Sequence, residues 1–258
     1  MDFYKYHGTG NDFILIDNRD GRAMLSEENI AMLCHRRFGI GADGLIFLGL
    51  SDKFDFDMRY FNADGKEGTM CGNGGRCIVA FAQRLGLISG KCTFNSIDGV
   101  HQASISKEEK NTVYVSLQMQ DVQNHQLIDG NIFMETGSPH YVIFSENVSQ
   151  MDVFRKGKEL RFDKKFSPDG TNVNFVEIRD DGIFVRTFER GVEDETLSCG
   201  TGVTASALAY AIEKGIEKAN IGIKTPGGKL NVKFEKNGDS FENIWLEGPA
   251  QMVFSGKT

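Results

Sequence analysis

Several features that mark other classes of protein are missing from this sequence. No stretch approaches the roughly 18 consecutive apolar residues of a membrane-spanning helix. The opening residues, MDFYKYHGTGND, lack the basic-then-apolar order of a secretory signal. There is no run of lysine and arginine, and the formal net charge is −7, which disfavours nucleic acid and anionic membranes as partners. We therefore expect a cytoplasmic protein that acts on a small molecule.

The cysteines also lack the patterns of structural sites. Their number is odd, and their wide spacing with no secretory signal argues against a disulfide framework. No close pair of cysteines or histidines has the spacing of zinc ligands, so we expect no metal. The five cysteines are Cys34, Cys71, Cys77, Cys92 and Cys199.

The chain is long enough for two domains and contains one internal repeat. It has 258 residues, 40% of them hydrophobic and 25% charged, which is the balance of a globular protein with a real core. The sequence CGNG at 71–74 returns as CGTG at 199–202, an offset of 199 − 71 = 128. Each copy opens an apolar, helix-like run that ends at a glycine, Gly86 or Gly215.

Similarity between the two halves extends to both sides of these motifs. Upstream, TGNDFILI (9–16) parallels TGSPHYVI, GADGLIFL parallels TNVNFVEI, and RYFNADG parallels RTFERGV. Downstream, each helix precedes a predicted hairpin, with turns at Asp98-Gly99 and Gly227-Gly228. A further helix is predicted to begin after Ser26, a good N-cap, and to end before Gly39. Strands dominate, so the predicted fold class is α+β with one helix packed in each half.

A cysteine followed by Gly-x-Gly at a helix start has a specific chemical consequence. The first N–H groups of a helix have no partner inside the helix, and the helix dipole places partial positive charge there. A thiolate at that position is stabilised, so its pKa falls below the free value of about 8.5. Glycine lets the backbone approach a bound anion, and the same N–H groups can hold a carboxylate.

Two such helix ends, placed face to face, could invert a stereocentre. One sulfur, as thiolate, would remove the proton from a carbon next to a carboxylate, and the other, as thiol, would supply a proton to the opposite face. Oriented N–H donors would stabilise the carbanion. A single cysteine beside a helix start is usually a small buried hydrophobe. Matched positions in a repeat favour function for Cys71 and Cys199, whereas Cys34, Cys77 and Cys92 are predicted to be core residues.

The motifs resemble one known family. HGTGNDFILID (7–17), FNADGKEGTMCGNGGRC (61–77) and FERGVEDETLSCGTG (188–202) are similar to signature segments of bacterial diaminopimelate epimerases, as are GTNVNFVEI and PGG. The resemblance implies cofactor-independent interconversion of LL- and meso-2,6-diaminopimelate, on the route to lysine and peptidoglycan. It also implies two similar, pseudo-symmetric halves, each a mixed or antiparallel sheet wrapped around a central helix. The expected halves are residues 1–118, completed by about 249–258, and 119–248, with the active site in the cleft between them.

The resemblance also assigns residues. Cys71 and Cys199 would be the acid–base pair, and a homodimer is a family-level expectation. The reacting carboxylate would be bound by Gly72, Asn73, Gly200 and Thr201. The rest of the substrate would be bound by Asn11, Asn62, Asn172, Glu189 and Arg190. Possible supporting positions are Gly44, Ser138 and His140.

Two supporting positions depart from the family pattern, and the third is ambiguous. Some relatives have Gln at the position of Gly44 and Asn at that of Ser138. Gly44 offers no side chain and Ser138 a shorter one, which affects the expected contacts to the substrate but not the cysteine chemistry. His140 matches a position that supports activity in the family, and a hydrogen-bonded core histidine is an equal alternative.

Other functions remain open at this point. Proline racemases, hydroxyproline epimerases and histidine racemases share the architecture. A proline-type site has no distant ammonium or carboxylate to bind, so Glu189 and Arg190 disfavour it, while histidine racemisation is harder to exclude. An isomerase of phenazine-type metabolism is expected to lack the cysteine pair. Outside enzymes, the chain could be a thiol redox sensor or a binding module.

Overall fold

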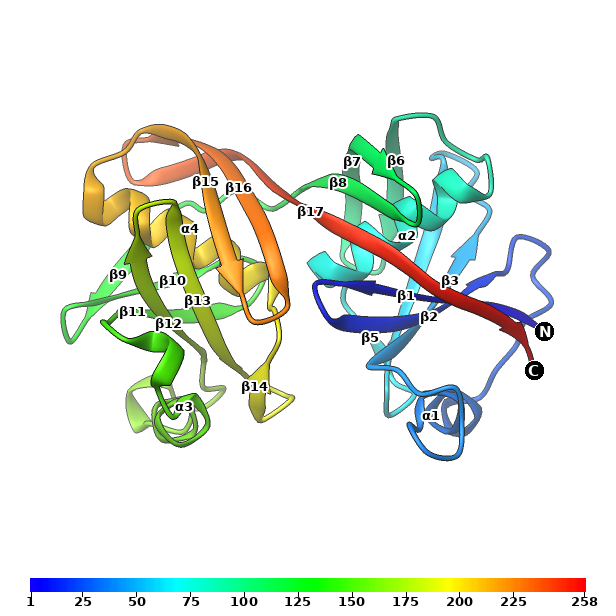
Figure 1. The fold of residues 1–258 in the computed structure, drawn as a ribbon, viewed down its shortest axis with the longest axis horizontal. Coiled ribbons are helices and arrows are strands. Elements are labelled where there is room, and N and C mark those ends of the chain that lie inside the picture. The colour runs from blue at the N-terminus through cyan, green and yellow to red at the C-terminus, as the bar shows by residue number, and fades with distance from the viewer. The chain divides into compact units, whose positions relative to one another are not determined.

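The computed structural model describes residues 1–258 and contains four α-helices among many strands. The chain divides into two compact units. Unit 1 comprises Met1–Leu117 together with Gly248–Thr258, and unit 2 comprises Gln118–Glu247. The last strand, β17 (Ser240–Lys257), is red in Figure 1 and contributes its first half to unit 2 and its second half to unit 1. None of the helices is long and apolar enough to cross a membrane.

The strands of unit 1 form a closed ring. The order of pairing is β1-β2-β3-β4-β6-β7-β8-β17 and back to β1, and it is antiparallel except for β2–β3 and β4–β6. A closed sheet has no exposed edge strand. The bounds are β1 (Asp2–Gly8), β2 (Asn11–Asp17), β3 (Gly44–Gly49), β4 (Phe56–Asn62), β5 (Glu67–Gly68), β6 (Lys91–Ser96), β7 (Gly99–Glu109) and β8 (Thr112–Gln118).

The core of unit 1 surrounds helix α2 (Gly72–Arg84). Every residue of α2 from Gly72 to Ala82 is buried, and Figure 1 shows the helix among the strands of its unit. A helix that is buried on all sides has to be apolar or small on all sides, as the sequence GNGGRCIVAFA is, apart from Asn73 and Arg76. The ring of strands therefore encloses the helix that begins next to Cys71.

Unit 2 repeats this arrangement around helix α4 (Gly200–Lys214), most of whose residues are buried. Its pairing order is β9-β10-β11-β12-β13-β15-β16-β17, with β11–β12 and β13–β15 parallel. The bounds are β9 (His125–Ile128), β10 (Asn131–Glu135), β11 (Pro139–Phe144), β12 (Asn172–Arg179), β13 (Gly182–Glu189), β14 (Asp194–Thr196), β15 (Lys218–Thr225) and β16 (Gly228–Asn237). The α+β class and the two pseudo-repeated halves are confirmed.

Strand register defines which residues are equivalent in the two units. Phe13 on β2 is paired with Gly44 on β3, and His140 on β11 is paired with Asn172 on β12. Gly44 therefore corresponds to Asn172, at the same offset of 128 as the cysteines. The alignment of GADGLIFL with TNVNFVEI in the sequence matches Gly44 to Asn174, and this alignment is wrong by two residues. A shift of two keeps the same side-chain alternation along a strand, so the pattern alone could not detect it.

The pairing of the next strands, β3 with β4 and β12 with β13, identifies further equivalent residues of the two units. Ile46 on β3 pairs with Tyr60 on β4, and Asn174 on β12 pairs with Thr187 on β13. Three apolar or aromatic positions of unit 1 thus correspond to three polar positions of unit 2. The equivalent pairs are Phe13 and His140, Ile46 and Asn174, and Tyr60 and Thr187.

The predicted local structure is confirmed, except that the turns of both hairpins are displaced by one residue. Helix α1 (Glu27–Cys34) begins at Ser26, whose side chain accepts a hydrogen bond from the Asn29 N–H, and α4 ends at Gly215 in the left-handed conformation. Both hairpins are present, but their turns lie one residue earlier than predicted, at 97–98 and 226–227. In each hairpin the second residue of the predicted turn, Gly99 or Gly228, is the first residue of the returning strand.

One α-helix was not predicted. Helix α3 (Val153–Arg161) lies between β11 and β12, the position that α1 occupies between β2 and β3. Its N-cap is Asp152, which accepts from the Arg155 N–H, and only Val153 and Gly157 are buried. Gly157 packs so closely on Phe188 that a Cβ there would lie 2.3 Å from the Phe188 Cβ. The sparse apolar pattern, interrupted by this glycine, explains why the sequence did not indicate a helix.

Candidate active site

Cys71 is the N-cap of the buried helix α2. Its backbone is extended, with φ −99° and ψ 141°, and its Sγ accepts a hydrogen bond from the Gly74 N–H at 3.3 Å. An N-cap side chain normally satisfies one of the free N–H groups of the first turn, and here a sulfur does so. A Cβ at Gly74 would lie 3.6 Å from that sulfur and 3.2 Å from the Ile46 side chain. The first turn of α2 is therefore packed closely around Cys71, whose residue remains half-buried.

Asn11 and Asn73 lie beside the Cys71 sulfur. The Asn11 Nδ2 donates to Asp43 Oδ2 at 2.7 Å, so its Oδ1 faces the helix, where it accepts from Asn73 Nδ2 at 3.1 Å. The same Oδ1 is 3.7 Å from the Cys71 Sγ. Three of the predicted site residues of unit 1 are thus brought together at one helix end.

Arg76 is a buried cation in the same place. It is fully buried, and its guanidinium donates to Gly72 O at 3.1 Å and to Asn73 Oδ1 at 2.8 Å. No carboxylate pairs with it, and its Nε has no hydrogen-bond partner. Burial lowers the pKa of Arg76, whereas the nearby sulfurs of Cys77 and Cys71 raise it. An unpaired buried cation is costly, and groups of this kind gather at functional sites, so the charge of Arg76 near Cys71 marks this helix end as a candidate site.

Gly44 and Asn62 are paired with each other on β3 and β4. A Cβ at Gly44 would lie 2.5 Å from the Phe61 carbonyl and 2.6 Å from the Tyr60 ring, so this chain has no room for a side chain there. The Tyr60 hydroxyl donates to Asn62 Oδ1 at 2.9 Å. Tyr60 therefore occupies the space next to Gly44, and the exposed Asn62 lies at the end of the strand.

Cys199 is the N-cap of α4, in the position equivalent to Cys71. Its backbone is again extended, with φ −113° and ψ 117°, but its side chain makes no capping hydrogen bond to the helix. The residue is 7% exposed. Its Sγ lies 3.4 Å from the Thr201 hydroxyl. The two cysteines share a place in the fold and differ in the group that contacts the sulfur.

A polar cluster supports Thr201. His140 Nε2 is 2.9 Å from Thr201 Oγ1 and 3.0 Å from Ser138 Oγ, and the two hydroxyl oxygens are 3.3 Å apart. The pKa of His140 is lowered to about 3, chiefly by burial and in addition by the positive charge of Arg190. His140 is thus neutral at physiological pH, and both alternatives for this residue hold in part: it is a core histidine and it contacts a predicted site residue.

Asn172 connects this cluster to the end of β13. Its Nδ2 donates to Pro139 O at 2.8 Å and to Ser138 Oγ at 3.2 Å, and its Oδ1 accepts from the Arg190 backbone N–H at 2.8 Å. Glu189 is the last residue of β13 and half-buried. The register places it opposite Asn172, as Asn62 lies opposite Gly44. Gly200 is the first residue of α4.

The remaining cysteines are core residues, as predicted. Cys34, Cys77 and Cys92 are buried. Burial raises the pKa of Cys34 to about 11 and that of Cys92 to about 12, and it raises the pKa of Cys77 further still. Thiols that hold their proton at neutral pH are poor nucleophiles and bases.

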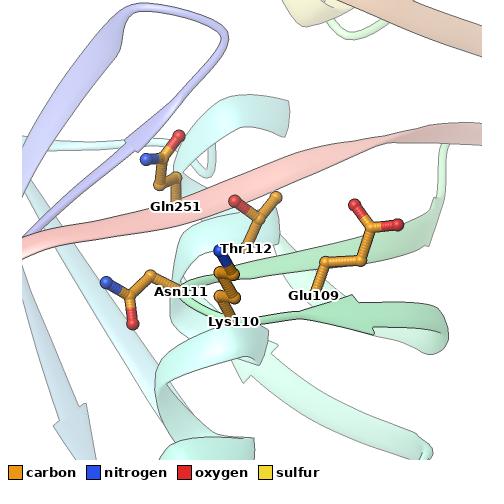
Figure 2. Close-up of a pocket in the computed structure, with 5 residues that line it drawn as sticks. All are labelled: Glu109, Lys110, Asn111, Thr112 and Gln251. Atoms are coloured by element: carbon orange, nitrogen blue, oxygen red, sulfur yellow. The ribbon is translucent and has the colours of Figure 1, made fainter.

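A separate surface hollow contains none of the predicted site residues. Figure 2 shows it at the turn between β7 and β8, beside β17. Its lining residues are Glu109, Lys110, Asn111, Thr112 and Gln251. It is open and has no convergent set of polar groups, so it offers no chemistry that competes with the cysteine sites.

Two residues of the cysteine sites were missed by the sequence. Arg76 follows a predicted binding segment in a helix, where a charged residue is usually solvated. Asn174 was aligned two residues out of register. In each case the signal was a polar residue inside an apolar run, and only the position of the helix and the register of the strands show what it contacts.

Solved structures of several enzymes share this fold. A phenazine biosynthesis protein of the PhzF family from Bacillus anthracis matches with a TM-score of 0.79 and 16% identity, over 100% of this chain and 98% of that one. A probable proline racemase from Agrobacterium radiobacter, with bound carbonate, matches with a TM-score of 0.74 and 13% identity, over 100% and 92%. At these identities the likeness concerns the fold.

Sequence relatives are much closer. The diaminopimelate epimerase of Flavobacterium psychrophilum is 49% identical over 258 residues, covering 98% of each chain. That of Chlorobaculum tepidum is 44% identical, covering 96% of this chain and 98% of the relative. The sequence model of the family described as diaminopimelate epimerase matches residues 3–123 and 132–253. With both cysteine motifs inside the match, this chain belongs to the diaminopimelate epimerase family.

Proposed function

We propose that the protein interconverts LL- and meso-2,6-diaminopimelate without a cofactor, as an isomerase on the route to lysine and peptidoglycan, with Cys71 and Cys199 as its two bases. The observation that carries the proposal is the pair of cysteines, each the N-cap of a buried helix at equivalent positions of two repeated units. Family membership supports the substrate.

The proton balance of the reaction needs one thiolate and one thiol. The thiolate takes the α-proton and becomes a thiol, leaving an electron pair on the α-carbon. The other thiol gives its proton to the opposite face of that carbon and becomes a thiolate. The stereocentre is inverted, and the enzyme is left with the two protonation states exchanged. General acid–base placement of this kind contributes about 10²- to 10⁴-fold in rate.

The helix ends stabilise the carbanion. The reacting carboxylate is bound by Gly72 and Asn73 of α2 and by Gly200 and Thr201 of α4. Backbone N–H groups at a helix start are directed at an anion and carry the positive end of the helix dipole. Negative charge that moves from the α-carbon into the carboxylate is then stabilised where it develops.

The second amino-acid group of the substrate needs both a cation and hydrogen-bonding partners. Arg190 grips its carboxylate through a guanidinium fork, and Glu189 accepts from its ammonium. Asn11, Asn62 and Asn172 complete the set, since an amide side chain both donates and accepts. Gly44, Ser138 and His140 act in support, and the bulk of Tyr60 beside Gly44 takes the place of a longer side chain.

Each of the two proposed halves, residues 1–118 with 249–258 and residues 119–248, contributes one of the two cysteines to the proposed reaction. Exclusion of water from the reacting carbon would protect the carbanion. Both sulfurs must be reduced, which accords with the cytoplasm, and the protein is proposed to be a homodimer. The partner is a small amino acid, with no role for nucleic acid, membrane or metal.

The activity is tested by following proton exchange. The reduced protein is incubated with LL-diaminopimelate in D₂O, and deuterium at the α-carbons is followed by NMR together with the ratio of isomers. We expect deuterium to enter as the meso isomer forms. L-Histidine and L-proline are tested in parallel, and exchange with either of them but not with diaminopimelate would replace the proposed substrate. Absence of exchange with intact thiols would overturn the enzyme function.

Single variants test the two-base mechanism. Cys71→Ala and Cys199→Ala should each lose interconversion by at least about 10²-fold, the lower size of an acid–base contribution. Cys92→Ala is the matched control, because Cys92 is a buried thiol of unit 1 outside the site. It should retain activity. Full activity in either active-site variant excludes a mechanism that needs both sulfurs.

A further inference from the structure

A buried chain of polar side chains runs through unit 2 and ends at Cys199. It begins at Thr187 on β13, whose hydroxyl donates to Asn174 Oδ1 at 2.8 Å. The Asn174 Nδ2 is 3.0 Å from His140 Nδ1, and His140 Nε2 is 2.9 Å from Thr201 Oγ1. Thr201 in turn is 3.4 Å from the Cys199 sulfur. His140 and Asn174 are fully buried, so their polar atoms have to be satisfied within this chain.

The first part of the chain fixes the position of the His140 proton. Because Asn174 accepts the Thr187 hydroxyl through its oxygen, its NH₂ group faces His140. An NH₂ group only donates, so Nδ1 of His140 is an acceptor and carries no proton. Burial keeps the ring neutral, and a neutral imidazole has one N–H. That N–H is therefore on Nε2, directed at Thr201 and Ser138.

The second part fixes the direction of the Thr201 hydroxyl. Ser138 Oγ accepts from Asn172 Nδ2, and within this cluster its own proton has Thr201 Oγ1 as its acceptor, because His140 Nε2 is itself a donor. Thr201 Oγ1 thus receives two hydrogen bonds, from His140 and Ser138. Its own proton then faces the remaining neighbour, the Cys199 sulfur. A sulfur that accepts a hydroxyl proton is stabilised as thiolate, since hydrogen bonds to charged acceptors are the stronger ones.

Unit 1 has no such chain. The residues equivalent to His140, Asn174 and Thr187 are Phe13, Ile46 and Tyr60. Phe13 and Tyr60 pack edge to face, with ring centroids 6.0 Å apart. The polar chain is therefore not a requirement of the fold, because the same strands build a stable core from apolar side chains at these positions.

Gly202 gives independent support. A Cβ at this residue would lie 2.5 Å from Asn174 Oδ1 and 3.2 Å from His140 Cε1. The second glycine of the CGTG motif is thus the residue that makes room for Asn174 and His140 against the first turn of α4. At the equivalent Gly74, the neighbours of such a Cβ are Ile46, Met58 and the cysteine sulfur, at 3.2 Å or more.

We propose that Asn174 is a positioning residue of the proposed reaction, which fixes the tautomer of His140 and through it turns the Thr201 hydroxyl onto Cys199. The inference rests on the proposed function of Cys199. The charged group that acts on His140 is Arg190, whose backbone also donates to Asn172. Asn174 itself touches neither substrate nor sulfur.

The tautomer is the most direct test, and it needs no substrate. Long-range ¹H–¹⁵N spectra of the full-length protein report which ring nitrogen of His140 is protonated, with His140→Gln to assign the signal. We expect Nε2–H in the wild type. In Asn174→Asp, the carboxylate accepts where the amide donated, so a proton should appear on Nδ1. A wild-type ring protonated on Nδ1 would overturn the proposal even if the protein is a fully active epimerase.

The effect on Cys199 is measured by alkylation. Iodoacetamide labelling of Cys71 and Cys199 is followed by mass spectrometry across pH. Asn174→Asp and Thr201→Val should slow labelling of Cys199 at neutral pH by about tenfold or more, the size of one hydrogen bond to a charged group, and leave Cys71 unchanged. Thr201→Ser should restore the rate. Ser206→Ala, which removes a buried hydroxyl of α4 outside the chain, is the control for loss of packing.

Kinetics separate positioning from stability. For diaminopimelate, Asn174→Asp is expected to lower kcat with little change in KM, and to move the pH profile of kcat/KM. Equal labelling of Cys199 in wild type, Asn174→Asp and Thr201→Val, with unchanged melting temperatures, contradicts the proposal. Failure of the wild type to exchange deuterium contradicts the proposed function instead, because the tautomer and the labelling do not depend on substrate.

Discussion

The starts of α2 and α4 are two versions of one structure. Each is a buried helix that begins at a cysteine N-cap and packs among the strands of its unit. At the equivalent positions 76 and 204, a side chain donates to the carbonyl of the first helical residue, Gly72 or Gly200. In unit 1 that side chain is Arg76, a buried cation. In unit 2 it is Thr204, which is neutral.

The side chains packed behind the two helix starts differ the other way round, because here the polar residues are in unit 2. Behind Cys71 the positions at 13, 46 and 60 are apolar or aromatic, whereas behind Cys199 the equivalent positions form a neutral hydrogen-bonded chain. Unit 1 thus offers its sulfur a nearby charge, and unit 2 offers its sulfur an oriented hydroxyl. Two sulfurs with exchangeable roles therefore need not have matching environments, because charge and hydrogen bonding stabilise a thiolate by different physical means.

The greatest effect is expected when His140 is replaced by phenylalanine, the residue at the equivalent position 13 of unit 1, and it concerns the pH dependence of the free energy of unfolding. Burial lowers the pKa of His140 to about 3, below the value of about 6.5 in an unfolded chain. The unfolded state therefore binds a proton that the folded state does not, and this contribution destabilises the protein as pH falls below about 6.5. His140→Phe and His140→Gln should remove it.

The measurement is urea unfolding at pH 7 and pH 5. Between these values, the free energy of unfolding of the wild type should fall by about 2 kcal/mol more than that of either variant. Equal changes in wild type and both variants would mean that His140 titrates in the folded protein as it does in the unfolded chain. The Gln variant keeps the test valid if a phenyl ring does not fit.

Removing the charge of Arg76 should act on Cys71 alone. Arg76→Met preserves most of the side-chain volume, and replacing a buried ion with an apolar group is often neutral for stability. We expect labelling of Cys71 by iodoacetamide at neutral pH to slow by about tenfold, equivalent to 1.4 kcal/mol in a protonation equilibrium. Labelling of Cys199 is the internal reference, and Arg76→Lys, which retains the charge, should lie near the wild type. If Arg76→Met and wild type label equally, Arg76 has only a structural role.

The smallest expected effect is a difference in stability between alanine variants of Gly202 and Gly74, the second glycines of the CGTG and CGNG motifs. Gly202→Ala places a Cβ 2.5 Å from Asn174 Oδ1, whereas Gly74→Ala meets its nearest neighbour, the flexible end of Ile46, at 3.2 Å. Overpacking costs about 1–3 kcal/mol, while alanine in a helix gains about 0.5–1 kcal/mol over glycine. Gly202→Ala should therefore lose about 1 kcal/mol in urea unfolding, and Gly74→Ala should be close to neutral. A greater loss of stability in Gly74→Ala than in Gly202→Ala would show that the surroundings of Gly74 are packed more tightly than those of Gly202.

Much of the fold and part of the site followed from local rules. The CGNG and CGTG motifs predicted two helix starts, Ser26 predicted a third, and the glycines after each helix and within each hairpin predicted where the chain turns. These features depend on a few adjacent residues, and their conformational preferences act at short range. Helix α3 was missed because its pattern of buried residues is too sparse for such rules.

The two cysteines, their helix N-termini and the repeat that relates them can be recognised in the amino-acid sequence, because each depends on residue type at short spacing. The surroundings of each sulfur depend instead on how distant parts of the chain pack together. Strand register brings Asn174 and Thr187 next to His140, and the enclosure of α2 buries Arg76 away from any carboxylate. Contacts of this kind join residues far apart in the chain, and a shift of two residues along a strand changes the neighbours while preserving the pattern.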